Sequence, residues 1–329
     1  MNPSKLISCT VLSLVLLGCG QSSGPSISTG TTPAQPASSP TTAVTSHAVG
    51  LVMKTLTNPF FIEMEKGARR AEKELDVALT VKTAAQETSI EQQIQLVNDL
   101  VAAKVKAIVI APGDSVSLIP ALKKAADAGI KIINIDNRLD SEALKQAGLA
   151  DVPFVGVDNE AGAYSAAQFL AAKITTPTQA AILEGIRSAD NARQRMEGAR
   201  RALSENKHIK LVASETANWK IDEAYTVTKQ LFTKHPDVKL LFAANDMMAM
   251  GASKYLQEAG KVNVKVVGFD ALSEVLTEIK AGHIAATVDQ QAAAQGYQGV
   301  SLALRLIKGE AVAPTTMIET RLITATDLK

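Results

Sequence analysis

The residues best suited to recognise a ligand stand just after the carboxyl ends of the predicted strands. Their carboxylate, amide and guanidinium groups each present two donors or acceptors in one plane, which suits neighbouring hydroxyls on a sugar ring. The aromatic residues among them can cover the C–H faces of the same ring. The set predicts a site for one monosaccharide. Its members are Asn58, Phe60, Phe61, Asp136, Asn137, Arg193, Trp219, Asn245, Asp270 and Gln290.

Each of these residues also has a purely structural interpretation. Asx residues at a strand-to-helix turn most often cap the helix, and aromatic residues there equally well fill the core. Asn58 is predicted to be an N-cap and Pro59 the first helical residue. Phe60 and Phe61 would then lie about 100° apart in the first turn. One could face a ligand while the other walls the cleft.

The elements that would position these residues alternate along the chain from residue 47 onward. Short β-branched apolar runs are separated by stretches of helical period, as in residues 89–104, where apolar residues recur at spacings of four, three and four. This alternation predicts an α/β fold with doubly wound parallel sheets. The predicted strands span residues 48–53, 78–83, 106–111, 131–136, 154–158, 180–185, 209–214, 239–244, 264–269 and 285–289.

The length of the chain predicts two domains. A chain of 329 residues with 46% hydrophobic content exceeds the size at which single cores usually stop growing. About ten strands are also too many for one compact sheet of average size. We place the first domain at residues 47–157 and the second at 158–290, with a further strand and helix after residue 290.

Several classes of function lose support from what the sequence lacks. The formal net charge is +1, with no long basic block to bind nucleic acid. The four histidines are scattered without metal-ligand spacing, and no dinucleotide, phosphate-loop or nucleophile-elbow motif occurs. We therefore expect no catalytic residues, no metal and no cofactor, and a protein that recognises a molecule rather than converting it.

The N-terminus has the pattern of an export signal. Lys5 precedes the apolar run LISCTVLSLVLLG, which is too short to span a bilayer. The sequence LLGC resembles the bacterial lipobox, so residues 1–19 are predicted to be a lipoprotein signal peptide with its lipobox ending at Cys19. The resemblance implies that Cys19 is acylated on its sulfur and becomes the first residue after cleavage. Residues 20–46 form a Ser/Thr/Pro/Gly-rich tether. The alternative is an ordinary signal peptide that contains a cysteine. Cys9 would leave with either signal, so no intrachain disulfide is possible.

Residues 48–329 as a whole resemble the ribose- and allose-binding proteins of bacterial ABC importers. This family has the type I periplasmic-binding fold, in which two α/β domains are joined by a three-crossing hinge. The segments that carry the resemblance are KTLTNPFF (54–61), NIDNRLDSEALKQAG (134–148), GVDN (156–159), ADNARQRMEGA (189–199), TANW (216–219), FAANDMMAMGA (242–252), VVGFD (266–270) and AATVDQ (285–290).

The resemblance implies the same ligand residues as the strand-end pattern and adds Lys54, a lysine of the allose type. The sugar itself stays open between allose and ribose. Ribose binders usually have Arg directly after Asp136, where this chain has Asn137, and allose binders tend to have Trp in place of Phe61. The family also implies hinge crossings near 157–158, 290–291 and 319–320. Residues 291–319 would then return to the first lobe and 320–329 to the second.

The function implied by the resemblance is capture of a monosaccharide between two closing lobes and its delivery to an ABC permease and its ATPase. The protein would be exported, monomeric and anchored to a bacterial membrane through Cys19. Two other classes stay open. The core of a sugar-responsive transcriptional regulator would require a DNA-binding helix-turn-helix before residue 47, where a signal and tether stand instead. A sugar-modifying enzyme would require paired carboxylates such as Asp136 and Asp270.

Overall fold

The structure is a computed structural model that describes residues 47–329. The predicted signal peptide, the predicted lipidation site Cys19 and the tether of residues 20–46 lie outside the described residues. Within the described part of the chain, no helix is long and apolar enough to cross a membrane.

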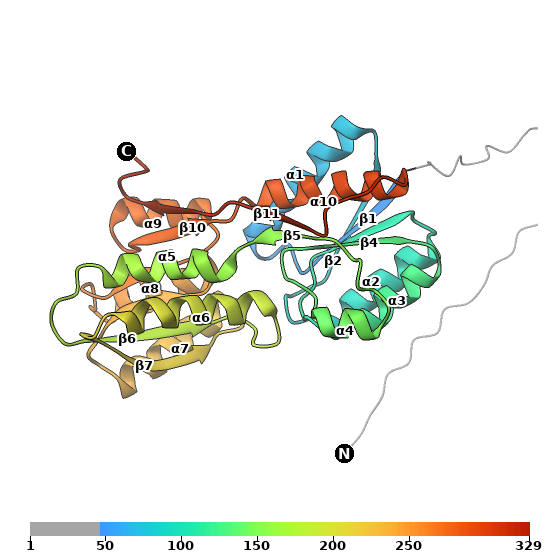
Figure 1. Ribbon diagram of the computed structural model, residues 1–329. Helices are drawn as coiled ribbons and strands as arrows, with labels where there is room; N and C mark the ends of the chain where they lie inside the picture. Colours follow the sequence, from blue (N-terminus) through green and yellow to red (C-terminus); the bar gives the residue numbers. More distant parts are fainter. Residues whose placement is uncertain (1–46) are drawn as a thin grey trace, which may run out of the picture. The chain divides into compact units, whose positions relative to one another are not determined.

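The first lobe is built on a six-stranded parallel sheet with the strand order β11-β5-β4-β3-β1-β2. Helices α1 and α10 lie side by side on one face of this sheet, and α2 and α3 pack against the other (Figure 1). The strands are β1 (Ala48–Met53), β2 (Ala78–Thr83), β3 (Ala107–Ile110), β4 (Lys131–Ile135), β5 (Phe154–Val157) and β11 (Thr315–Ile318). The helices are α1 (Pro59–Leu75), α2 (Ile90–Ala102), α3 (Ile119–Asp127), α4 (Ser141–Gln146) and α10 (Ala292–Ile307).

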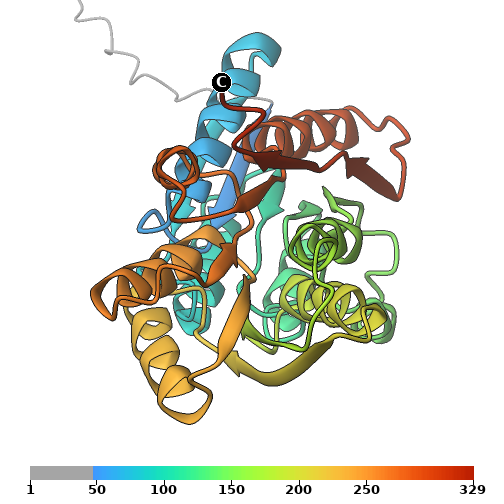
Figure 2. The same ribbon diagram turned by 90° about the vertical axis from the view of Figure 1, so that its left-hand side faces the viewer.

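The second lobe repeats the plan with the strand order β12-β10-β9-β8-β6-β7. Helices α5 and α6 lie side by side, in both views, on one side of the sheet, and α7 and α8 pair with each other (Figures 1 and 2). The strands are β6 (Thr178–Glu184), β7 (Ile209–Thr216), β8 (Val238–Ala243), β9 (Lys265–Val267), β10 (Ala286–Asp289) and β12 (Arg321–Thr324). The helices are α5 (Asn159–Ala171), α6 (Asp190–Glu205), α7 (Ile221–Lys234), α8 (Asp246–Glu258) and α9 (Ser273–Ala281).

The chain passes between the two sheets at three places: after Val157, between Asp289 and Ala292, and between Ile318 and Arg321. The predicted class, two α/β domains with parallel sheets, is confirmed. One strand departs from it, because β12 pairs antiparallel with β10. The chain leaves the second lobe along β10 and re-enters it along β12 through the neighbouring crossing, so these two strands run in opposite directions.

Burial of the strands and close packing between helices hold the elements of each lobe in fixed positions. Parallel strands covered on both faces read as continuous apolar runs, and all four residues of β3 are buried. Helix α6 approaches α5 most closely at Gly198, where a Cβ atom would lie 2.1 Å from the backbone oxygen of Glu160. Any larger residue at this position would push α6 away from its neighbour.

Candidate functional site

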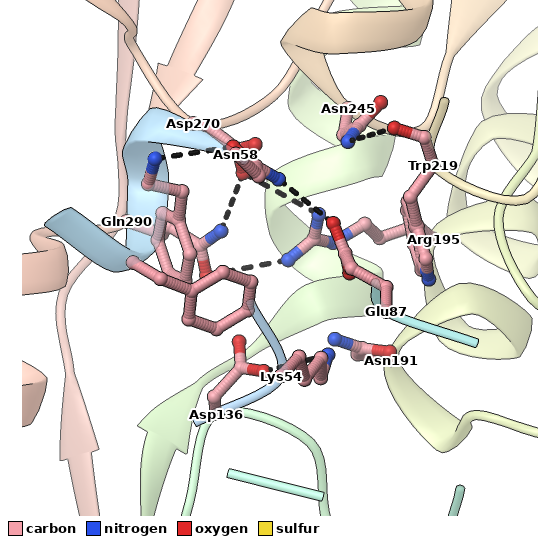
Figure 3. Close-up of a pocket in the computed structure, with 12 residues that line it drawn as sticks. Lys54, Asn58, Glu87, Asp136, Asn191, Arg195, Trp219, Asn245, Asp270 and Gln290 are labelled. Carbon is pink, nitrogen blue, oxygen red and sulfur yellow. Dashed lines mark hydrogen bonds and ion pairs between the residues drawn. The ribbon is translucent and has the colours of Figure 1, made fainter. Parts of the chain in front are cut away.

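A small cavity lies where the carboxyl ends of strands from both sheets meet (Figure 3). The space between the lining side chains amounts to about 230 Å³, including solvent at its mouth. No lining residue is more than 9% exposed, so both lobes close over the space. The lining residues are Lys54, Asn58, Phe60, Phe61, Glu87, Asp136, Asn191, Arg195, Trp219, Asn245, Asp270 and Gln290.

Three of the lining residues have a positive φ angle, a backbone conformation that residues other than glycine rarely adopt. Asp136 has φ 64°, Trp219 has φ 67° and Asp270 has φ 134°. Such conformations cost about 1–3 kcal/mol each and persist only where the surroundings hold them. Their concentration around one cavity indicates that these side chains are aimed at a function rather than at fold stability.

Lys54 and Asp136 form the polar corner that the first lobe contributes. Lys54 follows β1 and its Nζ lies 2.8 Å from Oδ2 of Asp136, which follows β4. The Lys54 Nζ also lies 5.5 Å from the centroid of the Phe61 ring. Among residues 47–329, this ion pair is the one polar contact of the Asp136 carboxylate. Figure 3 shows the other Asp136 oxygen directed towards the middle of the cavity.

Asn58 and Glu87 form a second polar group in the first lobe. The Asn58 Nδ2 donates to Oε1 of Glu87 at 2.9 Å, and the Asn58 Oδ1 accepts from the backbone N–H of Phe60 at 3.1 Å. Asn58 is therefore the N-cap of α1 and Pro59 its first residue, as predicted. Burial raises the pKa of Glu87, against the opposing charge of Lys54.

Arg195 occupies the centre of the second lobe's contribution. Its Nε donates to Oδ1 of Asn159 at 2.8 Å, its Nη1 to the backbone oxygen of Ala244 at 2.9 Å, and its Nη2 to Oε1 of Gln290 at 3.2 Å. The guanidinium stacks 3.8 Å from the centroid of the Phe269 ring. Desolvation lowers the pKa of Arg195, although nearby carboxylates oppose this shift.

Asp270 completes this group. Its Oδ1 accepts from Nε2 of Gln290 at 2.6 Å and lies 3.6 Å from Nη1 of Arg195. Burial raises the pKa of Asp270 well above its ordinary value, and the positive charge of Arg195 opposes the rise. Behind it, burial raises the pKa of Asp246 to about 7.

Aromatic rings close the cavity from both lobes. Phe60 and Phe61 both line it, with ring centroids 5.1 Å apart and planes at 82°. Both also belong to the core of the first lobe, so the functional and the structural interpretations of this pair hold together. Trp219 contributes from the second lobe, and Nδ2 of Asn245 donates to its backbone oxygen at 3.3 Å. The Trp219 ring rests on Gly185, where a Cβ atom would lie 2.1 Å from it.

The structure brings together all the sequence-predicted site residues except two. Arg193 does not reach the cavity: its side chain is 55% exposed and pairs with Asp190 on the surface of α6. Arg195 takes its place, because two residues along a helix turn the side chain by about 200°. The signal for Arg195 was available, since it lies on the same face as the small buried residues Ala192 and Ala199.

Asn137 is the second exception. It is fully buried but lies outside the cavity lining. Its Nδ2 donates to the backbone oxygen of Pro112 at 3.1 Å, and its Oδ1 accepts from the backbone N–H of Asn191 at 3.1 Å. Since Asn191 belongs to the second lobe, Asn137 joins the lobes instead of lining the space between them.

Three lining residues were not predicted: Glu87, Asn191 and Arg195. Glu87 follows β2, one of the strands after which the sequence interpretation took no ligand residue. Asn191 belongs to the first turn of α6, and its buried Oδ1 has no hydrogen-bond partner among the described residues. Within residues 47–329, no group of three His, Cys, Asp or Glu side chains is placed to hold a metal ion.

Comparison with known proteins agrees with this geometry. Residues 49–311 match the family described as periplasmic binding protein domain, and the chain therefore belongs to the periplasmic binding protein family. Over 265 residues it is 40% identical to the D-ribose/D-allose-binding protein of Pseudomonas aeruginosa, covering 80% of this chain and 82% of that protein. The D-allose-binding periplasmic protein of Escherichia coli is 34% identical, with 83% of this chain and 89% of that protein covered.

A solved structure points in the same direction. A periplasmic solute-binding protein of an ABC transporter from Actinobacillus succinogenes, with bound D-allose, superposes with a TM-score of 0.81 at 39% identity. The match covers 86% of this chain and 99% of that one. The resemblance to ribose- and allose-binding proteins, and the type I periplasmic-binding fold that it implies, are confirmed.

Proposed function

We propose that this protein captures one monosaccharide of the allose or ribose type between its two lobes and delivers it to an ABC import permease. The observation that carries the proposal is the closed cavity, in which polar side chains of both lobes face one another between Phe60, Phe61 and Trp219. The relatives described above are solute-binding proteins, which supports binding rather than catalysis.

The charges of the cavity favour a neutral, hydroxyl-rich ligand. Lys54 is paired with Asp136 and Arg195 with Asp270, so no fixed charge is left for an ionic ligand to neutralise. The remaining carboxyl, on Glu87, has a raised pKa. The paired groups still have hydrogen-bond donor and acceptor positions without a partner. A ring that carries several hydroxyls can bond to both kinds of position.

The expected affinity follows from a small number of contacts. A micromolar dissociation constant requires only about 8 kcal/mol. Hydrogen bonds to charged groups contribute roughly 1.5–3 kcal/mol each. A few such bonds to Asp136, Arg195 and Asp270 therefore suffice, even after the loss of translational and side-chain freedom.

Entry of a sugar requires the lobes to separate, since every lining residue is buried. We place the hinge at the three crossings, so that the first lobe comprises residues 47–157 with about 291–319, and the second 158–290 with about 320–329. Closure around the sugar would then create the surface that the permease recognises, with the ATPase acting on the permease. We further propose export and attachment to a bacterial membrane through an acylated Cys19, with residues 20–46 as the tether and the binding protein itself a monomer.

A thermal-shift screen of the protein without its signal peptide tests the sugar class. A ligand present at a thousand times its dissociation constant stabilises the folded state by about 4 kcal/mol. We expect D-allose or D-ribose to raise the melting temperature at millimolar concentration and the sugar to be recovered unchanged afterwards. If no pentose or hexose shifts the melt, the proposed ligand class is wrong; conversion of the sugar would favour an enzyme.

A further inference from the structure

Helix α6 begins without a side-chain cap from its own lobe. Its N-cap residue is Ala189, and within the described chain no side chain of the second lobe accepts from its first-turn N–H groups. The first four N–H groups of a helix have no acceptor inside the helix. Other helices here solve this locally: Asn58, Asp140, Asp158 and Asn245 cap α1, α4, α5 and α8 within their own lobes.

The first lobe supplies the missing acceptors across the cleft. The backbone N–H of Asp190 donates to Oγ of Ser115 at 2.9 Å, and that of Asn191 donates to Oδ1 of Asn137 at 3.1 Å. A third bond crosses in the other direction, from the backbone N–H of Ser115 to the backbone oxygen of Ser188 at 3.2 Å. These three bonds join the lobes directly beside the cavity.

Ser115 and Asn137 are held in place by their own lobe. The Ser115 hydroxyl donates to the backbone oxygen of Arg138 at 2.8 Å, which leaves its oxygen free to accept from α6. The Asn137 Nδ2 donates to the backbone oxygen of Pro112 at 3.1 Å, which turns its Oδ1 towards α6. The two acceptors therefore do not need the second lobe in order to be oriented.

We propose that Ser115 and Asn137 are positioning residues for the sugar site, which cap α6 across the cleft when the lobes are closed. The inference rests on the proposed function. Helix α6 carries Asn191 and Arg195 into the cavity, so a cap at its first turn holds both at the ligand. When the lobes separate, the two cross-cleft bonds break and water becomes the acceptor for the two N–H groups. They therefore act on release of the sugar and not on its first encounter.

The variant Ser115→Ala tests this with D-allose or D-ribose, whichever shifts the melt of the wild type more. In stopped-flow measurements we expect the dissociation rate to rise about five- to tenfold, as loss of one net hydrogen bond implies. The association rate should stay within about twofold. The melting temperature of the sugar-free protein should fall through loss of the Ser115–Arg138 bond within the first lobe, so the readout of the cross-cleft cap is the sugar dissociation rate, compared with that of a variant that leaves the first lobe intact.

Asp140→Ala is the matched control. Asp140 caps α4 with its side chain, entirely within the first lobe, so its loss should lower the melting temperature and leave the dissociation rate unchanged. Asp190→Pro tests the other partner: it removes the N–H that bonds Ser115 while keeping the helix, since proline is favoured at the first helical position and Ala189 is already extended.

We expect Asp190→Pro to accelerate release to a similar extent as Ser115→Ala. Dissociation rates equal to that of the wild type in both variants would overturn the inference while leaving the sugar site intact. Failure of the wild type itself to bind either sugar would instead refute the proposed function.

Discussion

The two ends of the cavity each contain a buried ion pair, yet the pairs are embedded differently. We call Lys54 and Asp136 the first-lobe end, and Arg195 and Asp270 the second-lobe end. Side-chain exposure is nearly the same, 3% and 2% at the first-lobe end and 3% for both residues at the second. Arg195 donates to three protein acceptors and Asp270 accepts from Gln290, whereas the Asp136 carboxylate contacts only Lys54 among the described residues.

This difference indicates that the two ion pairs have different roles in binding. Buried charges are costly unless their hydrogen-bonding capacity is filled. At the second-lobe end, protein groups occupy the hydrogen-bonding positions of the ion pair, so the pair is held in place before any ligand binds. The first-lobe end keeps unfilled acceptor positions on Asp136, and hydroxyls of a ligand would complete it. Disruption of the second-lobe end should therefore be the more damaging of the two.

The largest effect is expected for Asp270→Ala. This change leaves the Arg195 guanidinium buried without its carboxylate, and arginine cannot shed its charge. Removing one partner of a buried pair costs about 3–5 kcal/mol, so sugar binding should fall below detection by isothermal titration calorimetry. The circular dichroism spectrum should be unchanged, and sugar affinity equal to that of the wild type would remove Asp270 from the site.

A smaller but still large loss is expected for Arg195→Ala. Here the group left behind is Asp270, whose pKa is already raised and which can take up a proton to become neutral. Loss of its hydrogen bonds should weaken sugar binding by roughly 30- to 150-fold, or about 2–3 kcal/mol. Arg193→Ala, two residues away on the exposed face of α6, is the matched control and should change affinity by less than about twofold. Similar losses in both variants would contradict the placement of Arg195.

The first-lobe end should give a moderate and non-additive effect. Lys54→Met and Asp136→Asn each leave one buried charge alone, and each should weaken binding by roughly 5- to 30-fold. The double variant removes both charges and should lose less than the sum of the single free-energy changes. Calorimetry on all four proteins measures this coupling. Strict additivity would show that the pair does not act as a unit.

The sequence predicted most of the residues that line the cavity because its rule was geometric. Carboxyl ends of parallel strands meet at one edge, so residues after β1, β4, β8 and β9 had to converge. The rule worked for Asp136, Asn245 and Asp270, whose positions follow directly from where a strand ends, whereas Lys54 was expected only from the family resemblance.

The rule failed where the position depends on helix phase or on contacts between lobes. Arg193 and Arg195 both lie in the N-terminal half of α6, a similar number of residues after the end of β6. Which of the two side chains faces the cavity depends on the rotation of α6 about its own axis where it packs on α5. Asn137 directly follows the residue after a strand, where a ligand-binding residue is expected. Its side-chain oxygen instead accepts a hydrogen bond from the first turn of α6 in the other lobe. No local pattern encodes that contact.

Among the buried charged residues, the smallest effect on sugar binding is expected for Asp246, which packs behind Asp270 and outside the cavity lining. Its carboxylate accepts from the backbone N–H of Leu272 and from the Thr287 hydroxyl, and it does not line the cavity. Its pKa is raised from 3.8 to about 7 by burial. Between these values the folded protein holds a proton that the unfolded chain has released, so this group's contribution to stability falls as pH rises from about 4 to about 7.

Asp246→Asn removes this titration. We expect the free energy of unfolding of the wild type, relative to the variant, to decline across the interval from pH 4 to pH 7 and to level off above it, as measured by urea denaturation. Sugar affinity should differ by less than about threefold, because the amide keeps an oxygen to accept from the Asp270–Leu272 loop. Parallel stability curves for the two proteins would mean that Asp246 is ionised throughout and that the second-lobe end tolerates a further buried charge.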